Sequence, residues 1–552
     1  MNEVYVGIDV GGTHTDGVAV LESRIAHKVK VPTTDDLAAC TLEALEQLLD
    51  EIPPSYVSRV VLSTTLVTNA VVEEKLEKTG LVVTAGPGMN PASLLVDGDC
   101  RVAGGAIDHR GREIAPLDNE GVAGHLERMA GSGVRVLAAV GKFSVRNPAH
   151  ELRIGELAGG RFDYVALGHT LSGLLNFPRR VATAYLSAGV WRRYARFIEA
   201  IGEALTSFGI HAPLYILRAD GGTQLAASVR NPAETALSGP AASIMGAAAL
   251  DDMGADSFAF DIGGTTTDIS LFTGGVPLLE AKGAKIGRFR TQIRSLYTRS
   301  TGAGGDSLVS LEGDALKVGP RRLGPPASLG GAHPTPTDAL VLLGRALGDR
   351  EKAALVLTPI AESLGLMVEE TARRVLKALA GVIAKAAVAY LAEVNAKPVY
   401  TIHELLADRQ IRPRRAVAVG GPARALAPYV EEALDLPVHV PEHFDVANAI
   451  GAALSRVNLE VNLLADTAGG TLSIPEAGIF RSIPRSYSLA QAKEEAAEAL
   501  RTVARGKGLL DPEAVVEIAE EESFRVVEGS THAGNIHRLR LQIRPGLLRR
   551  LT

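Results

Sequence analysis

The stretch from Asp9 to Asp16 reads Asp-Val-Gly-Gly-Thr-His-Thr-Asp, and the stretch from Asp261 to Asp268 reads Asp-Ile-Gly-Gly-Thr-Thr-Thr-Asp. Six of the eight positions are identical, and the two copies begin 252 residues apart (261 − 9). One Gly-Gly loop is typical of an ordinary hairpin turn. A matched pair in one chain instead indicates a duplicated device.

Short apolar runs flank both copies, which predicts a strand, a tight turn and a second strand at each. These runs cover residues 4–8 and 17–21 around the first copy, and residues 258–260 and 269–272 around the second. Adjacent glycines allow positive φ and close backbone approach, while turn N–H groups and threonine hydroxyls donate hydrogen bonds to phosphate oxygens. We therefore expect each turn to bind an anion.

An aspartate opens each motif, at the end of a strand that faces the expected anion. A carboxylate and a phosphate repel each other unless a divalent cation lies between them, and Mg²⁺ is usually held through waters and one or two carboxylates. We therefore predict that Asp9 and Asp261 hold Mg²⁺ or orient the attacking group. Asp16 and Asp268 close the motifs, where they either share in this site or stabilise the turns.

The composition limits the classes of protein. A chain of 552 residues exceeds what one hydrophobic core usually organises, so two or more domains are expected. Lys and Arg number 57 against 63 Asp and Glu, for a net charge of −6, and no long basic run occurs. The chain therefore lacks the basic charge pattern that is typical of a nucleic-acid-binding protein.

Cysteine usage and hydropathy predict a cytoplasmic protein. Cys40 and Cys100 are too few for a disulfide scaffold, a cysteine-ligated zinc site or an iron–sulfur cluster within one chain. The N-terminus enters a strand without a signal-peptide pattern, and Lys385 interrupts the most apolar helical stretch, residues 381–392. Neither secretion nor membrane spanning is expected.

Strands and helices alternate along the chain, which indicates an α/β layered fold. Predicted helices cover residues 35–52, 182–205, 364–394 and 488–504, and predicted strands include residues 59–62, 81–83, 134–140, 164–167, 213–218, 416–419, 524–527 and 539–543. The strand at 213–218 runs into a third polar glycine turn, Ala219 to Thr223, at the sheet edge where ligands bind. The expected domains are residues 1–185, 186–460 and a small appendage at 461–552.

The ordered motifs resemble the two phosphate motifs and the adenosine motif of the sugar kinase, Hsp70 and actin superfamily. This resemblance implies two RNase H-like (actin-like ATPase) domains with ATP in the cleft between them. Within that group the chain is similar to the hydantoinase A and oxoprolinase family, which includes N-methylhydantoinases, 5-oxoprolinases and acetone-type carboxylase subunits. The motifs that carry the similarity are Gly7 to Asp16, Ser63 to Ala70, Ser238 to Gly246, Phe260 to Asp268, Gly302 to Ser307, Pro334 to Ala339 and Gly420 to Pro428.

The chain departs from the family pattern at positions that bear on the acceptor substrate. Leu62-Ser63 stands where the family usually shows His-Gly, and only the histidine of a Ser-His-Glu segment is retained, as His169. A Cys-Tyr-containing glycine segment is replaced by residues 325–331, and the C-terminal region is shorter than in the longer members.

The resemblance implies a set of site residues. The phosphates would be held around Gly11, Gly12, Thr13, Thr15, Gly263, Gly264, Thr265 and Thr266, with Gly304 and Gly305 lining the cleft and Gly420 and Gly421 on the adenosine side. The acceptor side would include Thr64, Thr65, Asn69 and His169, although a structural role for His169 is equally expected.

The implied function is ATP- and Mg²⁺-dependent hydrolysis of a cyclic amide such as a hydantoin or 5-oxoproline. Transfer of the γ-phosphoryl group to the carbonyl oxygen would turn that oxygen into a leaving group, and the protein would contribute positioning and charge stabilisation. A hydantoinase B-like second subunit and a homo-oligomer are the expected partners. The alternatives are a small-molecule kinase, an acetone-carboxylase-type subunit and an ATP-driven conformational switch.

Overall fold

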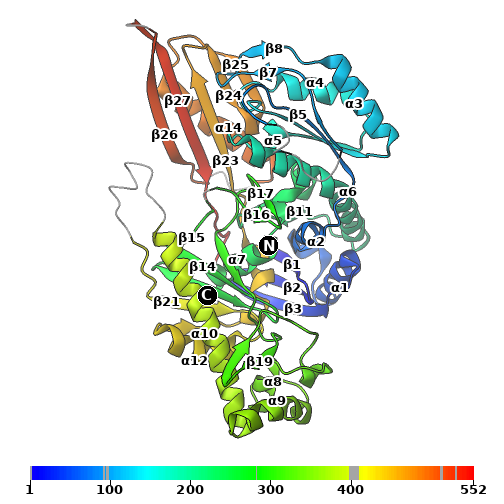
Figure 1. The fold of residues 1–552 in the computed structure, drawn as a ribbon, viewed down its shortest axis with the longest axis vertical. Helices are drawn as coiled ribbons and strands as arrows, with labels where there is room; N and C mark the ends of the chain where they lie inside the picture. The colour runs from blue at the N-terminus through cyan, green and yellow to red at the C-terminus, as the bar shows by residue number, and fades with distance from the viewer. Residues whose placement is uncertain are drawn as a thin grey trace.

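The two predicted hairpins lie in two separate sheets near the middle of an elongated molecule (Figure 1). The computed structural model describes residues 3–90, 94, 99–280, 282–396, 410–509, 514–528 and 531–551. A long helical region, residues 336–395, extends from one end of this centre. Residues 79–171 and the C-terminal sheet form the other end.

The first sheet carries the first hairpin and has the strand order β12-β11-β4-β1-β2-β3. Strands β1 and β2 are antiparallel with Asp9 opposite Asp16, whereas β4 and β11 run parallel to β1. Helices α1 and α6 cover one face through Leu45, Leu48 and Phe197. The bounds are β1 Val4–Val10, β2 His14–Leu21, β3 Arg24–Pro32, β4 Val57–Thr64, β11 Leu214–Leu217, β12 Thr223–Leu225, α1 Leu37–Leu49 and α6 Phe177–Ser207.

The second sheet repeats this plan, with the order β15-β14-β13-β21-β22 and β18 also pairing with β14. Strands β13 and β14 form the second hairpin with Asp261 opposite Asp268, and β21 runs parallel to β13. The duplication predicted from the sequence therefore extends to the order of the neighbouring strands. The bounds are β13 Ser257–Ile262, β14 Thr267–Thr273, β15 Val276–Pro277, β18 Thr298–Thr301, β21 Arg415–Val419 and β22 Val438–His439.

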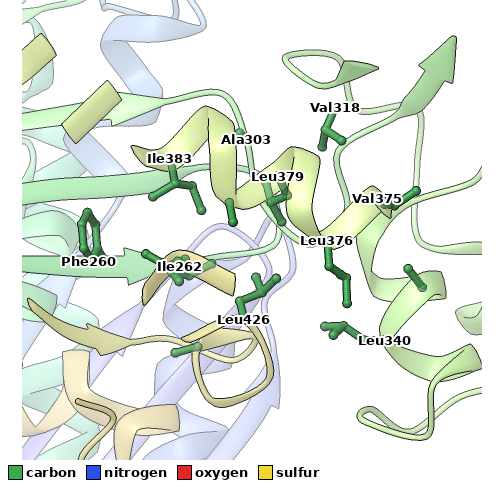
Figure 2. Close-up of a cluster of buried hydrophobic side chains, with 14 of the residues drawn as sticks. Phe260, Ile262, Ala303, Val318, Leu340, Val375, Leu376, Leu379, Ile383 and Leu426 are labelled. Atoms are coloured by element: carbon green, nitrogen blue, oxygen red, sulfur yellow. The ribbon is translucent and has the colours of Figure 1, made fainter. Parts of the chain in front are cut away.

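Helix α10 (Val368–Asn395) organises the core below the second sheet. Figure 2 shows its residues Leu376, Leu379 and Ile383 pointing toward Phe260 and Ile262 of β13 and toward α8 and α12. Among the described helices, α10 is the one whose length and composition would suffice to cross a membrane, and a row of its side chains belongs to this core. The other bounds are α8 Pro336–Leu342, α9 Arg350–Leu364 and α12 Ala423–Leu434.

The helix predicted at 364–394 is present as α10, although the structure starts it at Val368 and places Leu364 in the preceding helix, α9. Helix α9 ends at Leu364 and α10 begins at Val368. Between them Gly365 has a φ of 63°, which terminates α9 in the left-handed conformation.

Two helices of small residues, α7 (Ser238–Leu250) and α13 (Ala447–Leu454), cross between the two sheets. A Cβ on Gly246 would lie 1.8 Å from Ala447 O, and a Cβ on Gly451 would lie 1.9 Å from Ala242 O. Helix α13 also rests on β1, where a Cβ on Gly7 would lie 2.2 Å from Ala449 O. The backbones touch at these glycines, so any side chain would separate the two helices or lift α13 from the first sheet.

Two further sheets complete the fold. A parallel sheet of order β10-β9-β5-β6 is inserted in the chain between β4 and β11 of the first sheet, and a C-terminal sheet has the order β25-β24-β23-β27-β26. The bounds are β5 Thr79–Thr84, β6 Asp99–Val102, β9 Val136–Gly141, β10 Tyr164–Leu167, α3 Asn119–Gly131 and α4 Ala149–Ala158, then β23 Leu459–Asp466, β24 Thr471–Ile474, β25 Ile479–Ser482, α14 Leu489–Gly506, β26 Glu517–Glu528 and β27 Thr531–Ile543. The predicted segments 524–527 and 539–543 lie in two strands that pair, β26 and β27, but the segments do not face each other. Phe524 lies opposite Ile536, and Leu539 lies opposite Glu521.

Shorter elements connect these layers. Their bounds are η1 Pro54–Tyr56, α2 Leu66–Val72, β7 Ala106–Ile107, β8 Glu113–Ala115, α5 Gly168–Leu171, η3 Ala226–Ser228, η4 Pro232–Thr235, β16 Lys285–Ile286, β17 Phe289–Arg290, β19 Val309–Glu312, β20 Ala315–Val318, η5 Ala327–Leu329, η6 Phe444–Val446 and η7 Pro475–Ala477.

The expected division near residue 185 falls inside helix α6, and strands β11 and β12 beyond it join the first sheet. The strand at 214–217 therefore lies in the first layer, where the sequence analysis had placed it in the second domain. The reason is that α6 is a crossover helix, which returns the chain so that β11 pairs in parallel with β4.

Candidate functional site

The two hairpin turns are closed by the same hydrogen bond. Gly11 N donates to His14 O at 3.1 Å, and Gly263 N donates to Thr266 O at 2.9 Å. Gly12, Thr13 and Thr265 are exposed on the open sides of the turns, and no atom lies within 4 Å of a Cβ built on Gly12. Each turn therefore presents accessible backbone and threonine donors, as an anion site requires.

The predicted phosphate contact of Thr15 is wrong. Thr15 is fully buried, and its hydroxyl bonds to that of Thr33 at 2.9 Å. Its counterpart in the second copy, Thr267, is also buried and donates to Ala303 O at 2.7 Å. Alternation along the strand turns these two threonines away from the open side, so they brace the hairpins.

Asn448 at the start of α13 links the two carboxylates of the first hairpin. Its Nδ2 donates to Asp9 Oδ2 and to Asp16 Oδ2, both at 2.8 Å. Lys30 of the neighbouring strand donates to the other oxygen of Asp16 at 2.6 Å. Asp16 is thus neutralised within the hairpin, while Asp9 Oδ1 is buried and accepts no hydrogen bond in the described structure.

The carboxylates of both hairpins influence each other electrostatically. Burial raises the pKa of Asp9 to about 6, and the charges of Asp16 and Asp261 add to that rise. Burial likewise raises the pKa of Asp261 to about 7, with Asp268 contributing, and it also raises the pKa of Asp268. Four acidic groups from two distant parts of the sequence therefore converge on one region of unfavourable negative charge.

This donor set fits a hydrated divalent cation. Asp9 offers a buried oxygen without a hydrogen-bond donor, and Asp261 is destabilised as a carboxylate by its surroundings. Mg²⁺ typically binds one or two carboxylates and completes its shell with water and phosphate oxygens. No group of three or more acidic, histidine or cysteine side chains poised for a metal occurs among the described residues, so a bound cation would depend on those additional ligands.

A third glycine loop packs against the second hairpin. Gly305 N donates to Gly263 O at 3.0 Å, and Asp306 N donates to Gly264 O at 2.6 Å. A Cβ on Gly304 would lie 2.5 Å from Gly263 O, so no larger residue fits there. Gly304 and Gly305, predicted to line the cleft, are therefore part of the wall that supports the second turn.

The predicted adenosine turn also touches the second hairpin. Gly420 follows β21 with a φ of 93°, and a Cβ there would lie 2.6 Å from Asp261 Oδ1. A Cβ on the next residue, Gly421, would meet no atom within 4 Å, and Gly421 precedes α12. The structure thus brings together the second turn, the 302–307 loop and the Gly420-Gly421 turn.

A cavity of about 890 Å³ lies beside the first hairpin. Its lining includes Gly11, Gly12 and the predicted acceptor-side residue Asn69. The remaining lining residues are Thr33, Thr34, Asp35, Asp36, Leu37, Ala38, Leu66, Ala70, Glu73, Lys75, Arg193, Arg196 and Phe197. A cavity large enough for a small molecule therefore adjoins the first hairpin turn.

Thr64 and Thr65 lie at the same edge of the first sheet. Thr65 N donates to Val10 O at 3.2 Å, and its hydroxyl accepts from Asn69 Nδ2 at 3.4 Å. Thr64 is fully buried, and its backbone N–H and carbonyl both bond to the hydroxyl of Ser238 at 3.1 Å. Thr65 and Thr64 therefore position Asn69 and the end of β4, and Asn69 is the one of the three that lines the cavity.

The structure places His169 elsewhere. His169 is buried on α5, with Nδ1 2.6 Å from Glu151 Oε2 and its ring edge-on to Phe480. Glu151 also accepts from the backbone N–H groups of Gly141 and His169. This satisfied pair supports the structural interpretation of His169, and the residue is absent from the lining of the cavity beside the first hairpin.

Sequence reasoning missed the residues that complete the carboxylate site. Asn448 and Lys30 reach the first hairpin from other elements. Asn448 stands in a run of small residues, Ala447 to Ala453, that follows the adenosine turn. This polar residue was the signal that the sequence offered. A helix of small residues packs closely, and a polar side chain buried by that packing needs a hydrogen-bond partner.

The chain belongs to the hydantoinase/oxoprolinase family. The family model for hydantoinase/oxoprolinase matches residues 180–461, and that for the hydantoinase/oxoprolinase N-terminal region matches residues 5–161. Caprolactamase subunit alpha of Pseudomonas jessenii is 28% identical over 464 residues, covering 75% of this chain and 64% of that protein. The acetophenone carboxylase gamma subunit of Aromatoleum aromaticum is 28% identical over 392 residues, covering 61% of this chain and 53% of that protein.

Solved structures share the fold of this chain. A nucleotide-free acetone carboxylase aligns with a TM-score of 0.71 at 18% identity, over 100% of this chain and 88% of the other. The ATP-dependent caprolactamase of Pseudomonas jessenii aligns with a TM-score of 0.72 at 21% identity, over 97% of this chain and 86% of the other. The sequence matches to the curated relatives span about half to two thirds of their length.

Proposed function

We propose that this chain is the ATP-using subunit of an enzyme that activates the carbonyl of a cyclic amide. The observation that carries the proposal is the pair of matched hairpins, whose carboxylates Asp9 and Asp261 share one electrostatic site. The similar strand order of the two sheets around them supports two RNase H-like halves, as this function requires. Family membership and the ATP-dependent caprolactamase among the similar structures support the proposal.

The phosphates of ATP bind the open sides of the two turns. Gly11, Gly12 and Thr13 offer donors on one side, and Gly263, Gly264 and Thr265 offer them on the other. Asp9 and Asp261 would hold Mg²⁺. Bound Mg²⁺ would neutralise the charge that develops during phosphoryl transfer. Gly420 and Gly421 lie on the side of the nucleotide's sugar and base.

The cavity beside the first hairpin receives the ring amide. Its 890 Å³ lies within the usual range of small-molecule sites, and Asn69 supplies an amide that can bond a carbonyl or ring N–H. Phosphorylation of the carbonyl oxygen weakens amide resonance and makes the carbon open to water. After water adds, the ring C–N bond breaks and the nitrogen takes up a proton, which leaves an acyl phosphate. A second water hydrolyses the acyl phosphate and releases free phosphate and an open-chain acid.

An acetone-carboxylase-type role is the second candidate. It is favoured by the similarity to the acetophenone carboxylase gamma subunit and by the shared fold with acetone carboxylase. The same ATP site would then activate a ketone or bicarbonate oxygen in place of a ring amide. The subunit names of both curated relatives support a second, hydantoinase B-like chain as partner in either case. A cytoplasmic location and a homo-oligomer stay predictions.

The deciding experiment measures Mg²⁺-dependent ADP formation by the purified chain. Hydantoins, 5-oxoproline, a lactam and small ketones are each added, with and without a candidate second subunit. Acceleration by a ring amide with release of free phosphate supports the proposal, whereas acceleration by ketones with bicarbonate supports the carboxylase role. A stable phosphorylated product would indicate a kinase, and turnover indifferent to every compound would indicate a conformational switch.

A further inference from the structure

A second pocket, of about 480 Å³, lies apart from the cavity beside the first hairpin and shares no lining residue with it. Six separated segments meet there: residues 170–172, 218–234, 292–294, 459–460, 475–478 and 503–507. The third glycine turn of the sequence, at Asp220, contributes to its wall. We call it the Arg218 pocket.

Arg218 anchors a preorganised wall of this pocket. Its guanidinium donates to Asp220 Oδ2 at 2.8 Å and to Asn458 O at 2.9 Å, and Glu234 lies 3.5 Å away. A Cβ on Gly222 would lie 1.9 Å from Asn458 Oδ1, so the glycine turn is required for this arrangement. Buried charges held this rigidly are typical of ligand sites as well as of structural networks.

Two amide oxygens that belong to lining residues lack donors. Gln292 Nε2 donates to Leu174 O at 3.0 Å and to Leu175 O at 3.1 Å, which fixes its Oε1 as the oxygen without a partner. Asn231 Nδ2 donates to Glu234 at 3.3 Å, and its Oδ1 is unpartnered in the same way. Both side chains are more than nine-tenths buried. Such acceptors require N–H or O–H groups.

Two cationic side chains of the pocket keep a nitrogen without a hydrogen-bond acceptor. No hydrogen bond or ion pair engages the Lys507 ammonium within the described residues. Arg294 donates through Nη2 to Gln542 Oε1 at 3.1 Å, while its Nη1 makes no hydrogen bond and lies 3.8 Å from Glu460. The nearby carboxylates are already engaged, since Asp220 pairs with Arg218 and Glu476 receives three N–H donors. The pocket therefore offers cations to a carboxylate and acceptors to N–H groups.

We propose that the Arg218 pocket binds a small molecule that carries both a carboxylate and N–H groups, namely an amino acid or an N-carbamoyl amino acid. Lys507 and Arg294 face the carboxylate, and Gln292 and Asn231 face the N–H groups. Opening a ring amide or a hydantoin yields these two classes, so the link to the reaction product rests on the proposed function. The site is separate from the nucleotide hairpins.

Calorimetric titration of the nucleotide-free chain tests the proposal. The probes are 6-aminohexanoate and N-carbamoylglycine, compared with acetate, which lacks N–H groups, and hexanamide, which lacks a carboxylate. Binding of either bifunctional probe at least about tenfold more tightly than both comparison compounds is expected. Lys507→Met should weaken that binding at least about tenfold, because it removes the ammonium and keeps the aliphatic stem. Lys493→Met on the same helix, whose ammonium pairs with Glu521 at 2.9 Å outside the pocket, should leave it unchanged.

Several results would overturn the proposal: no binding of either probe by the unmodified chain, equal binding by the Lys507→Met variant, or acetate binding as well as the probes. Loss of binding in Asp9→Asn would place the ligand at the hairpin instead. Arg294→Met provides a second variant, and thermal unfolding confirms that each variant folds. Because ADP formation is measured separately, a chain that binds the probes without ATP turnover would contradict the proposed function alone.

Discussion

The side-chain amide of Asn448 donates a hydrogen bond of 2.8 Å to the carboxylate of Asp9, across 439 positions of sequence. The same nitrogen bonds to Asp16, so one residue of α13 holds two adjacent carboxylates at fixed positions. Helix α13 also contacts α7 through Gly451, and α7 packs beside the second sheet. Asn448 thereby joins the first carboxylate pair to the helix crossing between the two sheets.

Replacing Asn448 should therefore weaken catalysis through Asp9. Asn448→Ala removes hydrogen bonds to charged groups, which are worth about 1.5 to 3 kcal/mol each, and should lower kcat/KM for ADP formation about 10- to 100-fold. Asn448→Asp has nearly the same shape but adds a negative charge beside Asp9 and Asp16, and we expect a larger loss. Steady-state kinetics at several Mg²⁺ concentrations measure both. Equal activity in all three proteins would contradict the positioning role.

Neutralising either hairpin aspartate, Asp9 or Asp261, should lower the activity and raise the stability of the fold. Asp9→Asn and Asp261→Asn should each reduce Mg²⁺-dependent ADP formation at least about 100-fold, since an amide is a poor Mg²⁺ ligand. In Mg²⁺-free buffer both variants should unfold at higher temperature, because each removes a buried negative charge from among other carboxylates. The gain is about 1 to 3 kcal/mol, from the rise of these pKa values to about 6 and about 7.

Asp314→Asn is the matched control, since Asp314 is exposed between β19 and β20. It should change neither the ADP-formation rate nor the unfolding temperature. Retention of full activity in both Asp9→Asn and Asp261→Asn would show that the assignment of the active site is wrong.

Adjacent glycines in the predicted adenosine turn should respond differently to a methyl group. Gly420→Ala places a Cβ 2.4 Å from Ile262 O in a left-handed backbone, and overpacking of this kind costs about 1 to 3 kcal/mol. Gly421→Ala meets no atom within 4 Å and should change stability by less than about 0.5 kcal/mol. Urea unfolding of the nucleotide-free chain measures both, and similar losses would contradict the described packing of the turn.

The buried Glu151–His169 pair should make stability fall in acid. Burial alone would raise the pKa of Glu151, but the hydrogen bond and charge of His169, with the charge of Arg180, outweigh burial and hold this pKa below its usual value. The stability contributed by the ionised Glu151 is therefore present above its unfolded pKa of about 4.5 and is lost as the pH falls through the lower folded value.

Unfolding temperatures measured between neutral pH and about pH 3 test this dependence. Glu151→Gln should be less stable than the unmodified chain at neutral pH and should lose less on acidification. Glu120→Gln, an exposed change in the first turn of α3, should follow the curve of the unmodified chain. An identical acid slope in Glu151→Gln would assign the loss to other groups.

Local patterns predicted individual elements well. The apolar runs around the two motifs predicted both hairpins, and the helix predicted at 35–52 is present as α1. The predictions were wrong where a residue or strand contacts a segment that lies further along the chain. Thr15 looked like a phosphate ligand because it neighbours the turn, but its hydroxyl bonds to Thr33 of the next strand. The division near residue 185 overlooked that β11 pairs with β4.

The sequence by itself determined the duplicated turns, the alternating α/β order and the family, because each depends on residues close together in the chain. Only the tertiary structure decided which groups share a site. Asn448 reaches Asp9, and Arg218 meets Asn458, through packing of segments hundreds of residues apart. Helix periodicity and strand alternation specify which face of an element is buried, but the partner of that face depends on the shape and close packing of the whole core.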